Sequence, residues 1–522
     1  MARHLFVANS GNGSVSVADA GTRSVVATVA VGGEPVDVAI APDGTRAYVA
    51  NKGNNSVAVI ETKTNAQVAT IAVGKEPMGV AVSPDGHRVY VSNFGDDTVS
   101  VIDTGSNAVV GAPIAVGKEP DGAAVSPDGS RLLVAQRGGN VSVIDTGTNA
   151  LVGSAADLLG PSRLAVVPDG GRAFVTNSAS TSVTAFSPLN GSLAGGPIFI
   201  GTQPAGIAIV PSGQAAYVAG PLDGTITPLD TSSNAPLSAP IGGFPGATGI
   251  AIGPDGLQGY VTDGAGSTVS IFDLATNVPI GAIPVGTKPV GIAVVPDQGP
   301  RASLFVSPAR KRAKKAVAFH GSGSLDPDGK IATYAWDFGD GVRLEGGQET
   351  RFHRYRKPGE YLVTLKVTDE EGCSTGFVYT GQTASCHGSP LAVASSTISV
   401  GDTSGPILRL AGAKTQRLGG RIGVRARCPR EPCALRAHGV LVTTSALNVR
   451  GKPRGKRLGT AQALRPTRGW RTLRLRVPAG ARRAALRSLA LGGEVKAKVV
   501  VIARDDDDEL RLQQRKIELL AP

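Results

Sequence analysis

Aromatic residues, histidine and methionine are scarce in this sequence. Only 4% of the 522 residues are aromatic, and there are 6 His and 2 Met. This composition leaves little material for the aromatic platforms on which sugars and single-stranded nucleic acids stack. It argues against a lectin and against an RNA-binding protein, and we expect no nucleic-acid partner.

The sequence also lacks a long apolar run and a recognisable leader peptide. It has no stretch of 18 apolar residues, so no transmembrane segment is expected. Residues 1–10, MARHLFVANS, enter a strand-like pattern at once, and no signal peptide is visible. Either the protein is cytoplasmic or its true beginning lies upstream of Met1.

Cysteine is confined to the last third of the chain, as Cys373, Cys386, Cys428 and Cys433. The four residues form two close-spaced pairs. This spacing predicts two local disulfides, Cys373 with Cys386 and Cys428 with Cys433, and hence an oxidising compartment. Neither spacing is that of a short zinc knuckle, so a zinc site is not favoured.

Positive charge is concentrated towards the C-terminus. The chain carries 53 Lys and Arg against 41 Asp and Glu, but residues 401–522 hold 27 against 9, which leaves 26 against 32 for residues 1–400. A basic surface can attract a wall polymer, a membrane surface or nucleic acid without specifying the anion. The alternative is that arginines on the outer faces of strands only keep the domain soluble.

What the sequence does contain is a repeat. Glycine (70) and proline (35) are abundant, and Val, Thr and Ile gather in short runs between turns, which is typical of an all-β chain. Each repeat has four strand-like runs, for example GVAVS, RVYVSN, TVSVIDT and AVVGAPIAVG in residues 79–117, and this predicts a propeller blade. Turns of the Pro-Asp-Gly type recur every 41 to 43 residues, at Pro42, Pro84, Pro127, Pro168, Pro211, Pro254 and Pro296.

The ends of the repeat region give the number of blades. Residues 4–32 supply only three strand-like runs, and residues 290–296 supply one more first strand. Six whole units and this divided one predict a seven-bladed β-propeller over residues 1–298, closed by pairing both ends of the region in one sheet. Alanine precedes each turn proline by three residues, where innermost strands converge and need a small side chain.

The repeat resembles a known family. YVAN (48–51), YVSN (90–93) and FVTN (174–177), each followed by SVxVID-like and VG segments, are similar to the YVTN-family β-propeller repeat. LVAQ (133–136), YVAG (217–220) and YVTD (260–263) depart from the motif in individual loops. We expect the tyrosine of the motif to pack between blades.

The units differ most where the chain enters each innermost strand, at one mouth of the predicted channel. A solvated rim is the simpler interpretation of the charges there, and a binding site is the other. Some propellers that this fold resembles are lactonases or lyases, but the region has only His4 and His87, so we assign no catalytic residue. The candidate binding residues at this mouth are Glu34, Asp37, Glu76, Glu119, Asp121, Arg163 and Lys288.

Residues 299–402 resemble a second family. SLDPDG (324–329), WDFGDG (336–341) and YRKPGEYLVTLKVTD (355–369) are similar to a PKD domain, an immunoglobulin-like sandwich in which Trp336 is the expected core aromatic. Some PKD domains hold Ca²⁺, and turn chemistry alone is the other explanation for the aspartates of these motifs. The residues that the resemblance implies for a calcium site are Asp326, Asp328, Asp337 and Asp340.

Residues 403–522 alternate strand-like runs again and predict a second β-sandwich. CPREPC (428–433) is expected to tie one hairpin, DDDDE (505–509) to form a turn, and residues 480–491 to form one short helix. The segment resembles C-terminal sandwich domains of exported actinobacterial proteins.

Together these features predict an all-β, exported or cell-surface modular protein that is not an enzyme and is a monomer. We expect the propeller to be a binding head for a protein or cell-wall polymer and the PKD domain to be a spacer. No cofactor other than Ca²⁺ is expected. The alternative is a lactonase-like or lyase-like propeller enzyme with a divalent cation at the channel mouth. Such an enzyme needs at least two convergent acid, base or ligand side chains in the channel.

Overall fold

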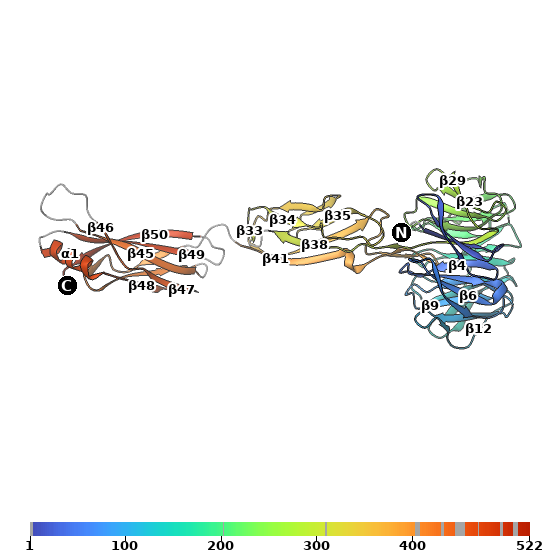
Figure 1. The fold of residues 1–522 in the computed structure, drawn as a ribbon, viewed down its shortest axis with the longest axis horizontal. Coiled ribbons are helices and arrows are strands. Elements are labelled where there is room, and N and C mark those ends of the chain that lie inside the picture. The colour runs from blue at the N-terminus through green and yellow to red at the C-terminus, as the bar shows by residue number, and fades with distance from the viewer. Residues whose placement is uncertain are drawn as a thin grey trace.

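Three β-rich domains follow one another along the chain in the computed structural model (Figure 1). The propeller lies at one end of an elongated molecule, the PKD-like domain in the middle, and the C-terminal domain at the other end. The structure describes residues 4–201, 203–307, 311–401, 408–429, 433–443, 455–467, 469–490, 494–504 and 510–522. Within these ranges no helix combines the length and apolarity needed to span a membrane.

Seven antiparallel sheets form the propeller blades, and six of them come from consecutive chain segments. Blade 1 contains β4 (Pro35–Ile40), β5 (Arg46–Asn51), β6 (Ser56–Glu61) and β7 (Ala66–Ala72), with the short 3-10 helix η1 (Lys52–Asn54) between β5 and β6. Blade 2 contains β8 (Pro77–Val82), β9 (Arg88–Asn93), β10 (Thr98–Asp103), β11 (Ala108–Val109) and β12 (Ile114–Ala115). Blade 3 contains β13 (Pro120–Val125), β14 (Arg131–Gln136), β15 (Asn140–Asp145) and β16 (Ala150–Ala155).

The next three blades repeat the same order from the innermost strand outward. Blade 4 contains β17 (Pro161–Val166), β18 (Ala173–Asn177), β19 (Ser182–Phe186) and β20 (Ile198–Phe199). Blade 5 contains β21 (Ile207–Ile209), β22 (Ala215–Gly220), β23 (Thr225–Asp230), β24 (Ala235–Pro236) and β25 (Ile241–Gly242). Blade 6 contains β26 (Ala247–Ile252), β27 (Gln258–Asp263), β28 (Thr268–Asp273) and β29 (Val278–Pro284).

Blade 7 joins the two ends of the propeller region. Its strands are β1 (His4–Asn9), β2 (Ser14–Asp19), β3 (Ser24–Ala30) and β30 (Pro289–Val294), in the order β3-β2-β1-β30. Strand β30 pairs antiparallel with β1, with Leu5 opposite Val294. The predicted seven-bladed ring with a divided blade is confirmed.

The repeated tyrosine packs between blades, as the motif predicts. Tyr48 and Tyr90 are each 1% exposed. Tyr48 of blade 1 shares a core cluster with Val80 and Val89 of blade 2. Burial of these rings joins neighbouring sheets through apolar contacts.

The PKD-like domain packs two sheets around an aromatic core and adds a small third sheet. The sheets are β33-β41-β38-β35-β36, β32-β34-β37 and β31-β40-β39. Trp336 is 1% exposed within this core, which confirms its predicted place. The elements are β31 (Asp297–Gln298), β32 (Phe305–Ser307), β33 (Lys311–Arg312), β34 (Val317–His320), β35 (Ile331–Asp337), β36 (Arg343–Gly346), β37 (Thr350–His353), β38 (Gly359–Asp369), β39 (Phe377–Tyr379), β40 (Ala384–His387), the 3-10 helix η2 (Pro390–Ala392) and β41 (Val393–Gly401).

The C-terminal domain is also built from two sheets, β42-β44-β48 and β43-β50-β49-β45-β46, with β47 paired to β45 (Figure 1). Helix α1 (Ala479–Ala490) covers nearly the residues predicted to be helical, while the predicted turn at 505–509 lies outside the described residues. Both predicted disulfides, Cys373–Cys386 and Cys428–Cys433, are present. The strands are β42 (Arg409–Ala411), β43 (Thr415–Arg417), β44 (Arg421–Arg427), β45 (Cys433–Thr443), β46 (Gly455–Arg457), β47 (Ala461–Thr467), β48 (Arg471–Arg476), β49 (Val495–Arg504) and β50 (Leu510–Leu520).

Candidate functional site

A hairpin of the PKD-like domain enters the propeller channel. It consists of β39, β40 and the connecting residues 380–383, and we call it the channel hairpin. The amides of Val82, Val125 and Val166 donate hydrogen bonds to the carbonyls of Gln382, Gly381 and Thr380, at 3.3, 2.7 and 2.9 Å. The amide of Ile40 donates to Thr383 Oγ1 at 3.2 Å. The hairpin is therefore bonded to the innermost strands of blades 1 to 4.

These four amide donors occupy equivalent positions, two residues before each turn proline. They lie on the open inner edge of each blade, where N–H groups have no neighbouring strand to bond. The hairpin supplies the acceptors that a further strand would supply. The equivalent residues of blades 5 to 7, Ile209, Ile252 and Val294, instead line a cavity of about 70 Å³ beside the hairpin.

Two residues of the hairpin allow its close contact with the innermost strands. Tyr379 is 0% exposed, and its hydroxyl lies within hydrogen-bond distance of the carbonyls of Val82 and Gly381, which share its single donor. Gly381 has φ +118°, and a Cβ at this position would lie 3.1 Å from Cβ of Ala124. Only glycine suits both the backbone conformation and the close approach to blade 3.

A charged pocket of about 200 Å³ lies at the other mouth of the channel, and Gln382 of the hairpin is one of its lining residues. Arg163 Nη1 lies 3.2 Å from Asp37 Oδ2, and Arg163 Nη2 lies 4.0 Å from Asp121 Oδ1. Asp121 Oδ2 accepts hydrogen bonds from Arg137 Nε and Ser162 Oγ, both at 2.9 Å. Blades 5 to 7 provide an uncharged wall that includes Ile207, Ile250 and Ile292. The pocket is therefore polar on one side and apolar on the other.

Burial and pairing compete in the electrostatics of this network. Burial raises the pKa of Asp37. The positive charge of Arg163 and the hydrogen bond from the amide of Val80 favour the ionised carboxylate and partly offset that rise. For Arg163 burial favours the neutral form, but the carboxylates of Asp37 and Asp121 outweigh it, and the pKa is raised. Asp121 is 1% exposed, and its Oδ1 has no hydrogen-bond donor among the described residues.

The structure brings together three of the seven residues predicted at this mouth, Asp37, Asp121 and Arg163. It also adds Arg137, Ser162 and Gln382, which the sequence did not single out. The other four, Glu34, Glu76, Glu119 and Lys288, are exposed and each directly precedes the proline that begins an innermost strand. They lie on the turns outside the pocket, so the seven residues do not form one charged ring.

A comparison of the repeats would have revealed part of this site. The residue five before each turn proline is glycine in five blades, namely Gly79, Gly122, Gly206, Gly249 and Gly291. The two exceptions are Asp37 in blade 1 and Arg163 in blade 4, which form the ion pair across the channel.

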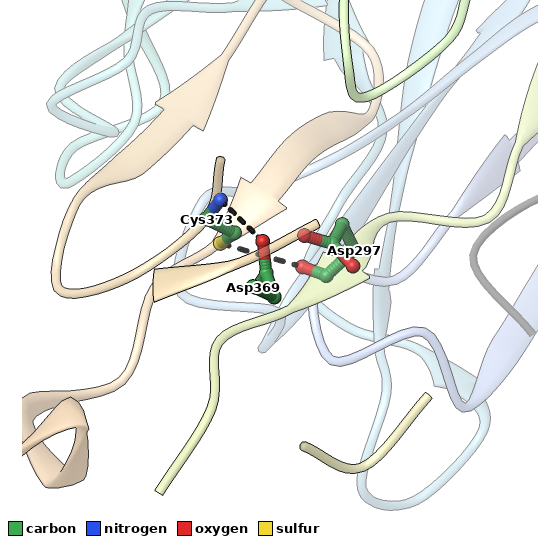
Figure 2. Close-up of side chains that lie close together, drawn as sticks. All are labelled: Asp297, Asp369 and Cys373. Atoms are coloured by element: carbon green, nitrogen blue, oxygen red, sulfur yellow. Dashed lines mark hydrogen bonds between the residues drawn. The ribbon is translucent and has the colours of Figure 1, made fainter. Parts of the chain in front are cut away.

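A second acidic cluster lies at the junction between the propeller and the PKD-like domain. Asp297 of β31 and Asp369 at the end of β38 are 0% and 2% exposed (Figure 2). Their carboxylates lie close to each other and to Cys373, whose amide donates to Asp369 Oδ1 at 2.7 Å. Asp326, Asp328 and Glu371 complete the charged surroundings of Asp297. Because Cys373 begins the disulfide that closes the base of the channel hairpin, the cluster and the hairpin are directly connected.

Carboxyl groups in this cluster hold their protons unusually tightly. Burial, together with the charges of Asp369 and Asp328, raises the pKa of Asp297 to about 9. Burial also raises the pKa of Asp369 and of Asp328 to about 6 each. Several carboxylates that are costly to ionise together would be stabilised by a divalent cation.

The cluster fits a hard cation such as Ca²⁺ in its donor set. Both carboxylate oxygens of Asp297, and one each of Asp326 and Asp369, are buried and have no hydrogen-bond donor among the described residues. Calcium takes six to eight oxygen ligands, mainly carboxylates, carbonyls and water. Asp297 and Asp369, whose carboxylate oxygens lie within 4.8 Å of each other, would hold such an ion, and Asp326 and Asp328 add negative charge around them. The sulfur of Cys373 is excluded as a ligand because it is part of a disulfide.

The structure separates the four aspartates that the sequence predicts as a calcium set into two places. Asp326 and Asp328 lie among the charges around Asp297, but Asp337 is the last residue of β35 and Asp340 follows it, at the end of the strand away from Asp326 and Asp328. There Asp337 accepts from Arg343 Nε at 2.7 Å, and Asp340 lies 2.8 Å from His353 Nε2. Asp369 could have been found from the alternation of β38, because it continues the inward positions of Val363, Leu365 and Val367.

Two family descriptions match parts of the chain. Residues 14–107 match the family described as "Lactonase, 7-bladed beta-propeller", and residues 297–383 match the family described as "PKD domain". The second match begins at Asp297 of the acidic cluster and ends in the channel hairpin. The chain therefore contains a propeller and a PKD-like domain.

Individual proteins match shorter or more distant parts. Collagenase ColA of Clostridium perfringens (strain 13 / Type A) is 46% identical over 59 residues, 11% of this chain and 5% of that protein. Microbial collagenase of Vibrio alginolyticus is 35% identical over 78 residues, 15% of this chain and 9% of that protein, so the chain spans less than a tenth of either relative. The structure of a functionally unknown protein from Desulfotomaculum acetoxidans DSM 771 matches with a TM-score of 0.50 and 17% identity, over 56% of this chain and 98% of that chain, which shows the fold alone.

Proposed function

We propose that this is an exported, non-enzymatic modular protein whose propeller is a ligand-binding head. The observation that carries the proposal is the channel hairpin, because it occupies the mouth on the side of the PKD-like domain along blades 1 to 4 and borders a concave pocket at the other mouth. Rigid concave pockets with a few placed polar groups are the usual form of a small-ligand site. Export is supported by the two disulfides, which persist in oxidising compartments.

The chemistry of the pocket favours binding over catalysis. The carboxylates of Asp37 and Asp121 both pair with guanidinium groups, and paired carboxylates are poor general bases. Arg137 is bonded through Nε, its side chain is 44% exposed, and its terminal nitrogens have no acceptor among the described residues. With the apolar wall opposite, the pocket suits a carboxylate on an apolar stem, presented by a protein or a wall polymer.

The proposal is tested by calorimetric titration of the full chain with benzoate, hexanoate and N-acetylglutamate. We expect at least one probe to bind, and Arg137→Met to weaken it by about tenfold, because a charged hydrogen bond contributes about 1.5–3 kcal/mol. Arg131→Met is the matched control: Arg131 begins the strand β14 that Arg137 follows, but it pairs with Asp145 away from the pocket.

The enzyme alternative is tested in parallel by a lactone-hydrolysis screen with added Ca²⁺, Mg²⁺ or Mn²⁺. Metal-dependent turnover that Asp37→Asn abolishes would overturn the proposal and support a lactonase-like function. Failure of all three carboxylates to bind would contradict the proposed ligand chemistry.

A further inference from the structure

One outer sheet face of the C-terminal domain carries arginine at most of its outward positions. Along β44 and β48 the alternate residues Ile422, Val424, Leu473 and Leu475 face the core and are at most 3% exposed. The outward positions of β42, β44 and β48 carry six arginines, which we call the arginine face: Arg409, Arg421, Arg425, Arg427, Arg474 and Arg476.

The register places some of these like charges directly opposite one another. Arg421 lies opposite Arg476, and Arg409 lies opposite Arg427. Opposed like charges on neighbouring strands are destabilising. In the described parts of the chain none of the six arginines forms an ion pair with a carboxylate. Among the described residues the arrangement therefore places like charges side by side without a compensating ion pair.

Trp470 holds two of these guanidinium groups in place. Arg427 and Arg425 lie 4.7 and 5.4 Å from the centroid of its ring. Cation–π contacts of this kind restrict the guanidinium while leaving its N–H edges able to bind an anion. Two arginines on the face are therefore oriented before any ligand arrives.

The other sheet of the same domain does not share this bias. On its outer face Lys496 lies opposite Glu518, Lys498 opposite Lys516, and Val500 opposite Gln514. Acidic, basic, amide and apolar side chains are mixed there. The arginine face is thus a feature of one sheet and not a consequence of the basic composition of the whole domain.

We propose that the arginine face anchors the protein to a flexible, linear polyanionic glycopolymer. Outward residues recur about 7 Å apart along a strand and about 5 Å apart between strands, which suits anionic groups that recur along a polymer. The described helix of this domain, α1, contacts β45 and β49 of the other sheet, so among the described residues the face presents no helix to a nucleic-acid groove. Two arginines lie over the ring of its aromatic residue, Trp470, which leaves little platform for base stacking. The face belongs to the end of the molecule remote from the propeller (Figure 1).

The test measures binding of the full chain to immobilised polygalacturonate by biolayer interferometry over a range of NaCl concentrations. The variant R421Q/R425Q/R474Q/R476Q removes four charges from the arginine face. The control R436Q/K496Q/K498Q/K516Q removes four charges from the opposite sheet, so both variants have the same net charge. We expect binding that weakens with salt, a loss of more than about tenfold in the first variant and less than about threefold in the control.

Folding is checked independently of binding. Because the first variant removes opposed like charges, its unfolding midpoint is expected to equal or exceed that of the wild type; if it fails to fold, R421Q/R476Q replaces it. The proposal is overturned by equal losses in both variants, by no binding, or by tighter binding to single-stranded DNA or to vesicles containing phosphatidylglycerol than to polygalacturonate. None of these outcomes bears on the carboxylate pocket of the propeller, so the two proposals fail separately.

Discussion

The residue that stands five positions before each turn proline determines how neighbouring innermost strands pack. At the five glycines a Cβ would overlap the neighbouring strand, for example the carbonyl of Asp121 beside Gly79 and that of Val290 beside Gly249. Asp37 takes the same position in blade 1 and uses its carboxylate to accept a hydrogen bond from Val80 of blade 2 at 3.1 Å. Arg163 takes it in blade 4 and reaches back across the channel to Asp37. One position therefore serves close packing in five blades and charge pairing in two.

Replacing Arg163 by methionine should destabilise the propeller strongly. The change leaves Asp37, 6% exposed, and Asp121, 1% exposed, without their shared guanidinium, and uncompensated buried charge costs about 3–5 kcal/mol. Urea unfolding followed by circular dichroism measures the loss. The control is Lys75→Met in the exposed pair with Asp96, for which a change within about 1 kcal/mol is expected. Equal effects of the two substitutions would refute the structural role of the network.

The acidic cluster should give the PKD-like domain an inverted pH dependence. The raised pKa values, about 6 for Asp328 and Asp369 and about 9 for Asp297, mean that the folded domain binds more protons than the unfolded chain above about pH 4. Stability therefore falls as the pH rises through this window, most steeply up to about pH 6. With EDTA present, the unfolding temperature reported by Trp336 fluorescence in a Trp470→Phe variant should decrease from about pH 5 to about pH 8.

Calcium should remove that decrease, because the ion favours the ionised carboxylates over the protonated ones. Millimolar CaCl₂ is expected to raise the unfolding temperature more at about pH 8 than at about pH 5. Asp369→Asn should abolish the calcium response, and Asp337→Asn, outside the cluster, should retain it. The same pH slope with EDTA and with calcium would rule out the cation site.

At the scale of secondary-structure elements, the blades could be predicted and the channel hairpin could not. The strand pattern repeats every 41 to 43 residues, and each strand is specified by its own alternation and bounding turns. The hairpin tip, TGQT at 380–383, has no such pattern, and its acceptors are backbone carbonyls that any sequence possesses. Its position depends on the fit of Tyr379 and Gly381 to a ring whose bonded residues lie 214 to 343 positions earlier in the chain, and local sequence does not encode that contact.

A similar limit applies to the charged mouth. Glu34, Glu76, Glu119 and Lys288 stand just before the proline that starts a strand, and three of them have φ between 49° and 59°. Asp37, Asp121 and Arg163 stand one or two residues after that proline. The sequence places all seven near the channel, but only the backbone conformation separates the turn residues from those in the strand.

Substituting Gly381 by valine should displace the hairpin from the propeller channel. A valine would have to adopt φ near +118° with its Cβ against Ala124 and Val166, and a strained backbone of this kind costs about 1–3 kcal/mol before any steric overlap. We expect thermolysin to cleave within residues 379–385 at least about tenfold faster than in the wild type. Gly376→Val is the matched control, since a Cβ there meets no atom within 4 Å. Equal cleavage of both variants would contradict insertion of the hairpin.

At the scale of the whole molecule, the propeller and the PKD-like domain form one unit and the C-terminal domain another. The first two are joined by the hairpin and by the hydrogen bond from Gln298 Nε2 of β31 to the carbonyl of Pro42 at 3.1 Å. Among the described residues no substantial contact joins an element of the C-terminal domain to either of the others. Elements that share bonded contacts unfold cooperatively, and those that do not unfold separately.

The two tryptophans report on these units independently. Trp336 lies in the PKD-like core and Trp470 on the arginine face, and the chain has no other tryptophan. In a Trp470→Phe variant, the fluorescence transition of Trp336 should coincide with loss of propeller circular dichroism during denaturant unfolding. A Trp336 transition well separated from that of the propeller would show that the hairpin does not couple the two domains.

The route by which the spacer leaves the ring determines how the molecule would carry tension. The chain exits the propeller only after β30, whose partner in the sheet is the N-terminal strand β1. If that were the sole connection, a pull on the spacer would peel β30 from β1 one bond at a time. The channel hairpin offers a second path, because its bonds to Ile40, Val82, Val125 and Val166 distribute the load over four blades. A propeller held in this way should stay attached to the PKD-like domain when its ligand and the anchored end of the chain are pulled apart.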